Sequence, residues 1–171
     1  NVVNGRYMLY YSKSEWGGEW TCGIGIASAT FPQGPFIDHG ALFISQDIGI
    51  QNCIDPFYIE DHGKKYLFWG SFHGIFGAEL TEDGLALKPG TKPVQVADNQ
   101  MEATYIHKHG DYYYLFGSAG TCCEGVNSTY QVIYGRSKNL FGPYTTKEGK
   151  NMLDGAYDVL LHGSNLVAGP G

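Results

Sequence analysis

Two acidic residues, Asp55 and Glu102, occupy the same place in a repeated sequence pattern. The segment Asn52–Phe72 has an acid, an apolar strand, a polar turn and an aromatic strand that ends in Gly-Ser, and Met101–Ser118 repeats this order. Glu102 follows Asp55 by 47 positions, as the two Gly-Ser pairs follow each other. Two carboxyl groups that converge in a fold can divide the tasks of proton donor and proton acceptor. This pair is therefore the first candidate for chemistry.

The elements around each acid form a unit of short strands joined by turns. A third copy of the turn and aromatic strand is Gly5–Ser12, whose preceding strand we expect to lie upstream of this sequence. Repeats of about 40–50 residues with four short strands each are typical of β-propeller blades, in which the innermost strands line a central funnel. No segment has the 3.6-residue apolar period of a helix. We therefore predict an all-β propeller with almost no helix, in which Asp55 and Glu102 face the funnel.

The alternative is that both acids are turn or rim residues without a role. Asp55 stands between Ile54 and Pro56. In such an apolar setting an idle carboxylate is costly to bury, and this favours a functional role.

Composition and charge limit the classes of function. A chain of 171 residues can bury one substantial core. Its 25 glycines and 13 tyrosines favour a turn-rich β fold. The net charge of −6, without a basic run, argues against nucleic acid and anionic membranes as partners. No stretch approaches the roughly 20 apolar residues of a membrane span, and no signal segment is visible.

The cysteines and histidines do not form a metal-binding pattern. Cys122 and Cys123 are adjacent, and because a ring closed by neighbouring cysteines is strained, we expect free thiols. No Cys or Cys/His set has zinc-site spacing. His107 and His109 are better explained as strand and turn residues than as a metal pair. No metal ligand is predicted in this chain.

A set of motifs in order resembles glycoside hydrolase family 43, and within it the endo-α-1,5-L-arabinanase group. The resemblance covers nearly the whole chain and rests on these segments: Asn52–Pro56, Tyr66–Phe72, Glu102–Tyr105, Cys122–Tyr130, Gly135–Ser137, Gly142–Tyr144 and Gly169–Gly171. It implies a five-bladed β-propeller with three catalytic acids in the funnel. Asp55 then matches the auxiliary aspartate that positions the acid and tunes its pKa, and Glu102 matches the general acid.

Two parts of the family's pattern are absent from this sequence. The resemblance implies a general base, an aspartate on the first blade, upstream of Asn1, and a histidine near a central metal ion just after Gly171. Residues 1–171 are thus expected to form a partial propeller: blade two from its second strand, blades three and four, and the start of blade five. We expect this piece alone to be inactive or nearly so. The resemblance implies no cofactor for the chemistry, and a structural calcium or sodium ion at the propeller centre.

The resemblance implies inverting hydrolysis of α-1,5-L-arabinan, a plant cell-wall polysaccharide, by general acid and base carboxylates. One alternative is an exo-acting β-xylosidase or α-L-arabinofuranosidase of the same fold. Another is a non-catalytic carbohydrate-binding propeller, since fold alone does not give function. The expected partner is an oligo- or polysaccharide, arabinan or xylan, and the implied location is extracellular or periplasmic.

Residues near the strand ends and in one loop are candidates for substrate binding: Asn52, Ser71, Phe72, Ser118 and Cys122. Phe72 follows a Gly-Ser pair and serves either a sugar ring or the core. Cys122 lies in the loop after an aromatic strand, where the family builds substrate subsites; the alternative is a loop that packs small polarizable side chains. Trp69, by contrast, is expected to pack between blades.

Overall fold

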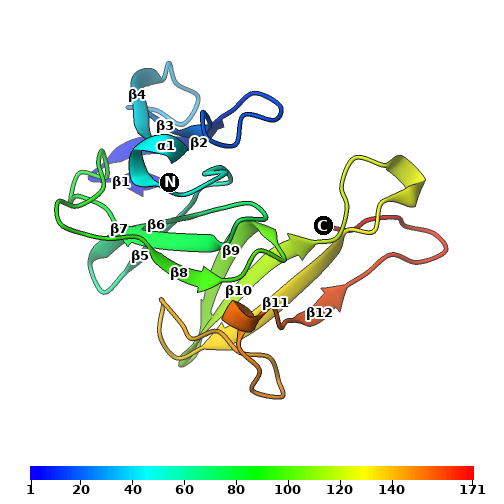
Figure 1. Ribbon diagram of the computed structural model, residues 1–171. Helices are drawn as coiled ribbons and strands as arrows, with labels where there is room; N and C mark the ends of the chain where they lie inside the picture. The colour runs from blue at the N-terminus through cyan, green and yellow to red at the C-terminus, as the bar shows by residue number, and fades with distance from the viewer. The chain divides into compact units, whose positions relative to one another are not determined.

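Three four-stranded sheets make up the computed structural model, which describes residues 1–171 (Figure 1). In every sheet the four strands are neighbours in the order in which they follow one another in the chain. This up-and-down order of four short strands is the arrangement of a propeller blade. The chain divides into two compact units, residues 1–70 with 77–93 and residues 71–76 with 94–171.

The first sheet consists of β1 (Val2–Val3), β2 (Arg6–Lys13), β3 (Gly23–Ala29) and β4 (Ile37–Ile44). Strand β1, of two residues, pairs with β2 on the side where we expected a strand from upstream of the chain. Asn4 and Gly5 join the two strands with φ angles of 49° and 77°. Two positive φ angles are typical of a two-residue hairpin turn, and asparagine and glycine tolerate them.

The second sheet consists of β5 (Phe57–Asp61), β6 (Lys64–Trp69), β7 (Ile75–Glu79) and β8 (Val94–Ala97). His62 and Gly63 form the turn between β5 and β6, again with two positive φ angles. The apolar end of β6 is fully buried. Its last residue, Trp69, packs against Phe43 of the first sheet, with ring centroids 4.8 Å apart. The predicted packing of Trp69 between neighbouring sheets is confirmed.

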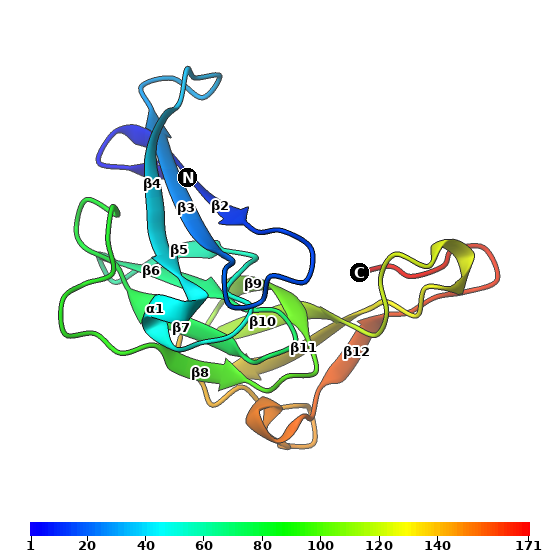
Figure 2. The ribbon, with the colours of Figure 1, turned by 45° about the horizontal axis from the view of Figure 1, so that its top comes forward.

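The third sheet consists of β9 (Glu102–His109), β10 (Tyr112–Ala119), β11 (Gln131–Ser137) and β12 (Asp158–Leu161) (Figure 2). The register between β9 and β10 shifts between Phe116 and Ser118, which is a β-bulge. Gly117 stands at this bulge because Met101 and the backbone of Glu102 leave no room for a side chain. A bulge bends a strand and redirects its side chains. Here it does so beside Glu102.

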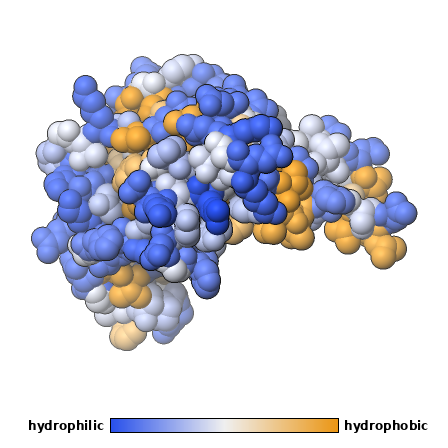
Figure 3. Space-filling model, turned by 90° about the horizontal axis from the view of Figure 1, so that it is seen from below, coloured by the Kyte–Doolittle hydropathy of each residue, from blue (hydrophilic) through white to orange (hydrophobic).

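Helical structure is limited to α1 (Ser45–Ile48) and the 3₁₀ helices η1 (Gly125–Asn127) and η2 (Met152–Asp154). The expectation of almost no helix is confirmed. All three fall far short of the length and apolar character that a membrane-spanning helix has. On the face shown in Figure 3, hydrophobic groups lie between larger hydrophilic areas.

Two tryptophans provide a matched test of the core, because Trp69 is 0% exposed and Trp16 is 96% exposed. Trp69→Ala is expected to lower the free energy of unfolding by about 3–5 kcal/mol, since it removes buried area and leaves a cavity. Trp16→Ala is expected to change this free energy by less than about 0.5 kcal/mol. Urea unfolding followed by circular dichroism measures both. Equal effects of the two substitutions would contradict the assigned core.

Candidate active site

Glu102 is held at the first position of β9 by contacts within the second unit. The hydroxyl of Ser71 donates a hydrogen bond of 2.6 Å to Glu102 Oε2, and the N–H of Phe72 donates to Met101 O at 3.0 Å. Ser71 is 2% exposed, so its hydroxyl is shielded from water. One oxygen of the carboxyl group is thus anchored by protein. The other oxygen, Oε1, takes no part in this hydrogen bond.

Asp55 lies in the first unit, in the segment that leads from α1 to β5. Its backbone N–H donates to Ser12 Oγ at 2.9 Å, and the preceding carbonyl, Ile54 O, accepts from the N–H of Gly70 at 2.9 Å. The φ of Asp55 is 57°, in the left-handed region that asparagine and aspartate enter more readily than other non-glycine residues. The two hydrogen bonds hold this backbone conformation and thereby fix the Cα of Asp55, from which the carboxylate side chain extends.

The serine at the end of an aromatic strand contacts the acid of the next repeat. Ser12 lies near the end of β2 and contacts Asp55, and Ser71 follows β6 and contacts Glu102. Ser12 accepts a hydrogen bond from the backbone, whereas Ser71 donates one to the carboxyl group. In the structure, Ser71 is therefore a positioning residue for the acid. The sequence analysis did not select Ser12. The signal was its position, because Ser12 ends the aromatic strand Gly5–Ser12 just as Ser71 ends the corresponding strand of the next repeat.

Backbone strain is concentrated at the predicted site. Among non-glycine residues with positive φ, Asn4 and His62 belong to the hairpin turns described above, where this conformation is ordinary. The others are either predicted site residues or their immediate successors: Asn52, Asp55, Phe72, Ala103 and Cys123. Strained backbone persists only where the surroundings hold it, and it clusters at active sites and ligand clamps. This distribution supports the choice of residues.

Three predicted residues of the second unit gather around Glu102. Ser71 binds its carboxyl group, and Ser118 is buried and lies opposite Glu102 in the ladder of β9 and β10. Phe72 is 36% exposed. The alternative of a core position does not fit this exposure, and a contact between Phe72 and sugar stays a prediction.

Asn52 belongs to the first unit, three positions before Asp55. Its N–H donates to Glu19 O at 2.8 Å, and its Oδ1 accepts a contact from Cys22 Sγ at 3.8 Å. These contacts fix the start of the segment that carries Asp55. A contact between Asn52 and sugar stays a prediction.

Cys122 and Cys123 form a disulfide, which corrects the expectation of free thiols. They lie in the loop between β10 and β11, where Cys123 has a φ of 67°. The sequence does not reveal this left-handed conformation of Cys123, which occurs together with the ring that the disulfide closes. In Figures 1 and 2 the loop runs beside the C-terminal segment, and Gly169 lies against Ser128. Cys122 is half-buried in this loop, and its neighbour is exposed.

The cysteine pairing can be read by alkylation and peptide mapping. Cys22 and Cys53 are free and buried, and burial raises the pKa of the Cys53 thiol to about 11. Cys53 is therefore protonated at neutral pH and both side chains are shielded. We expect iodoacetamide to modify Cys22 and Cys53 only after unfolding, and Cys122 and Cys123 only after reduction. Alkylation of the last two without reductant would contradict the disulfide.

Metal ligands do not cluster within residues 1–171. No group of three or more His, Cys, Asp and Glu side chains in the structure could hold a metal ion. His107 and His109 stack on β9, with ring centroids 6.4 Å apart. The structural ion that the resemblance implies stays a prediction, and no step of the chemistry is assigned to it.

Comparisons with known proteins cover the whole chain. A family model described as glycosyl hydrolases family 43 matches residues 1–171. The extracellular endo-α-(1→5)-L-arabinanase 1 of Bacillus subtilis is 39% identical, over 98% of this chain and 54% of the relative. The extracellular exo-α-(1→5)-L-arabinofuranosidase ArbA of Cellvibrio japonicus is 33% identical, again over 98% of this chain and 54% of the relative. The chain spans about half the length of these curated relatives.

Solved structures share the fold. A Cellvibrio cellulosa α-L-arabinanase complexed with arabinohexaose matches with a TM-score of 0.89 and 32% identity, over 99% of this chain and 60% of that chain. A GH43 endo-arabinanase from Bacillus licheniformis matches with a TM-score of 0.87 and 35% identity, over 100% and 61%. The prediction of an all-β chain that forms about three blades of a five-bladed β-propeller is confirmed. With the family model matching from its first residue to its last, the chain belongs to glycosyl hydrolases family 43.

Proposed function

We propose that this chain is part of a glycoside hydrolase that cleaves α-1,5-L-arabinan with inversion of the anomeric carbon, and that Glu102 is its general acid. The observation that carries the proposal is the hydrogen bond from buried Ser71 to Glu102 Oε2. Glu102 stands at the position in its repeat that Asp55 occupies in the preceding repeat. The relatives named for endo- and exo-action on α-(1→5)-L-arabinan support the choice of sugar.

Glu102 supplies the proton in the proposed reaction. With Oε2 anchored by Ser71, Oε1 faces the glycosidic oxygen and gives it a proton as the bond to the anomeric carbon breaks. A base carboxylate activates water on the opposite face of the sugar, roughly 6.5–9.5 Å from the acid, which leaves room for that water. The resemblance places this base outside residues 1–171.

Asp55 acts in the proposal as an ionised neighbour of the general acid. A negative charge nearby disfavours ionisation of a carboxyl group and so keeps the proton on the acid. The left-handed backbone of Asp55 and its hydrogen bond to Ser12 would hold this charge in place.

Sugar contacts are proposed for Phe72 and for the loop that carries Cys122. The partly exposed ring of Phe72 offers a flat apolar surface to a furanose ring. The disulfide of Cys122 and Cys123 gives the loop a closed, polarizable surface. Asn52 and the buried Ser118 stay predicted contributors to the walls of the site.

Two other functions are kept. Exo-acting α-L-arabinofuranosidase activity is favoured by one relative that is named for it; a β-xylosidase of the same fold has no comparable support. A carbohydrate-binding propeller without catalysis is the second alternative. The length of the released products separates endo from exo action, and hydrolysis of any kind excludes the non-catalytic alternative.

The test is hydrolysis of defined α-1,5-arabino-oligosaccharides by the intact protein, with products followed by proton NMR from the first minutes. We expect oligosaccharide products whose new reducing ends first appear in the β configuration, because single displacement inverts the α linkage. Appearance of the α anomer first would contradict the mechanism. Release of single sugars only would favour the exo alternative, and xylo-oligosaccharides serve as the control substrate.

We further propose that the protein acts outside the cell, in line with the relatives named as extracellular, and that the chemistry needs no cofactor. Cell fractionation of the source organism, with activity on arabinan as the readout, tests the location.

A further inference from the structure

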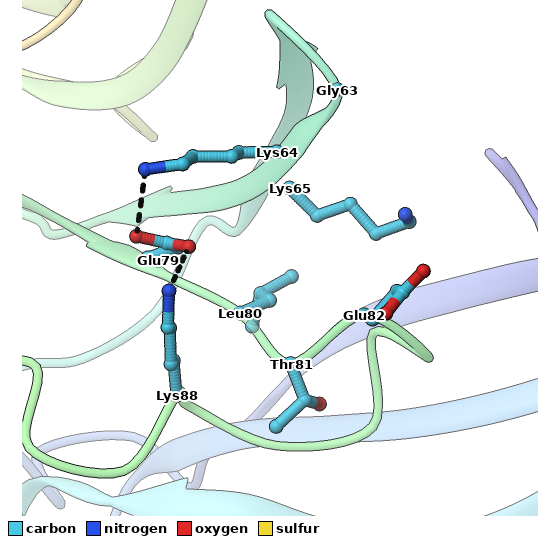
Figure 4. Close-up of a pocket in the computed structure, with 8 residues that line it drawn as sticks. All are labelled: Gly63, Lys64, Lys65, Glu79, Leu80, Thr81, Glu82 and Lys88. Carbon is cyan, nitrogen blue, oxygen red and sulfur yellow. Dashed lines mark hydrogen bonds and ion pairs between the residues drawn. The ribbon is translucent and has the colours of Figure 1, made fainter.

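A pocket of about 500 Å³ lies in the first unit, at the turn end of the hairpin formed by β5 and β6 (Figure 4). Residues of the turn, of β6, of the end of β7 and of the segment after it line the pocket: Gly63, Lys64, Lys65, Glu79, Leu80, Thr81, Glu82 and Lys88. The proposed function uses none of them.

The pocket and Asp55 lie toward opposite ends of this hairpin. Strand β5 leads from the Asp55 segment to the turn at His62 and Gly63, and β6 returns to Gly70. At about 3.4 Å per residue, a strand of this length separates the two ends by more than 15 Å or so. Binding in the pocket is therefore independent of proton transfer at the candidate acids.

Most of the charges in the pocket are already paired around Glu79. Lys88 Nζ lies 2.6 Å from Glu79 Oε1, and Lys64 Nζ lies 3.9 Å from Glu79 Oε2. Figure 4 shows the two ammonium groups on either side of this carboxylate. The hydrogen bond from Lys88, followed by the charges of both lysines, lowers the pKa of Glu79. Glu79 is thus occupied as a counter-ion.

Lys65 is the lysine of the pocket that makes no ion pair of 4.0 Å or less. Lys65 is 8% exposed. Its side chain leaves β6 on the opposite side from Lys64 and extends along the pocket (Figure 4). Its ammonium group makes no hydrogen bond and no ion pair of 4.0 Å or less. Glu82 lines the same pocket, and Glu60 stands opposite Lys65 in the ladder of β5 and β6. The nitrogen itself is not sealed from solvent. A buried stem thus holds an ammonium group that has no ion pair, which favours an anion there.

The lining also limits the kind of anion. Three lysines face two glutamates, so the excess is a single positive charge, which suits a monoanion better than a dianion. Glu82 is exposed at the pocket and can accept hydrogen bonds from hydroxyl groups. A carboxylate on a hydroxylated ring meets both demands, and the volume accommodates one such ring.

We propose that this pocket binds a sugar acid, with the carboxylate on Lys65 and ring hydroxyls on Glu82. The site is a second carbohydrate contact on the blade, directed at an acidic sugar rather than at the neutral sugar of the hydrolytic reaction. The sugar acid is either free or a unit of an acidic polysaccharide, and the two share this chemistry.

The experiment is calorimetric titration of the intact protein with galacturonic acid, galactose and a galacturonic acid oligosaccharide at neutral pH. We expect galacturonic acid to bind and galactose, which lacks only the carboxylate, not to bind. Binding should weaken as salt is added, because the contact is ionic. Oligosaccharide binding at least as tight as that of the monomer assigns the site to a polymer, and binding of the monomer alone assigns it to the free acid.

Substitutions in and outside the pocket test whether the acid binds at Lys65. Lys65→Met keeps the length of the stem and removes the charge, and it is expected to weaken binding by roughly tenfold or more. Lys92→Met, at an exposed lysine of the same unit outside the pocket, is the matched control and should bind as the parent does. Glu82→Gln removes a repelling charge and keeps an acceptor for hydroxyls, so it is expected to tighten binding. It also decides the question if the Lys65 variant does not fold.

Equal binding of galactose, unchanged binding by Lys65→Met, or weaker binding by Glu82→Gln would overturn the proposal. Glu102→Gln is expected to bind galacturonic acid like the parent. Loss of arabinan hydrolysis with retained acid binding therefore separates this proposal from the proposed function.

Discussion

Glu102→Gln is expected to lower kcat on α-1,5-arabino-oligosaccharides by roughly 10²- to 10⁴-fold, the usual contribution of a positioned general acid. Glutamine keeps the shape of the side chain and can still accept the hydrogen bond from Ser71, but it has no proton to give to the leaving oxygen. Substrate binding should survive, so KM is expected to change far less than kcat. Initial rates of reducing-sugar release measure both constants.

A substrate with a better leaving group makes this test specific for proton donation. An aryl α-L-arabinofuranoside with an acidic phenol needs little help from an acid, so the variant should lose much less activity on it than on arabinan. Glu148→Gln, at an exposed glutamate of the same unit, is the matched control and should match the parent on both substrates. An equal loss on the two substrates would point to a binding or folding defect and contradict the role of Glu102.

Asp55→Asn is expected to lower kcat by about 10²-fold, a loss typical of a catalytic group that is no longer well positioned. Initial rates on one arabino-oligosaccharide measure the loss.

The backbone makes asparagine the right substitution at this position. Asp55 has a φ of 57°, which asparagine tolerates and alanine does not. The contact with Ser12 uses the N–H of residue 55 and survives the change. Unfolding by urea should therefore give nearly the parent stability, and Asp55→Ala should be less stable. A normal rate would remove Asp55 from the mechanism.

The positions of the two serines explain how each repeat holds the acid of the following repeat in place. Ser12 and Ser71 each end an aromatic strand and contact the acid of the following repeat. A strand of one repeat thereby holds the candidate acid of the next. Serines at these places are expected to matter for turnover rather than for binding, and Ser71→Ala should reduce kcat with little change in KM.

The sequence by itself determined the strands, their turns and the repeat-equivalent acids. These are local features: apolar and aromatic residues alternate along a strand, and turns such as Asn4-Gly5 need particular residues. The equivalence of Asp55 and Glu102 also follows from local pattern, since each acid keeps the same offset from its Gly-Ser pair. The short strand β1 was not predicted, because two residues are too few to show the alternation of a strand.

Only the tertiary structure decided how the side chains meet. The contact of Ser71 with Glu102 joins residues 31 positions apart, and the sequence offers a substrate role for Ser71 just as readily. The disulfide of Cys122 and Cys123 depends on a left-handed residue in a loop, and the lack of an ion pair at Lys65 depends on which acids its neighbours have already taken. Such contacts are set by packing between segments distant in the chain, whereas strand and turn preferences act over a few residues.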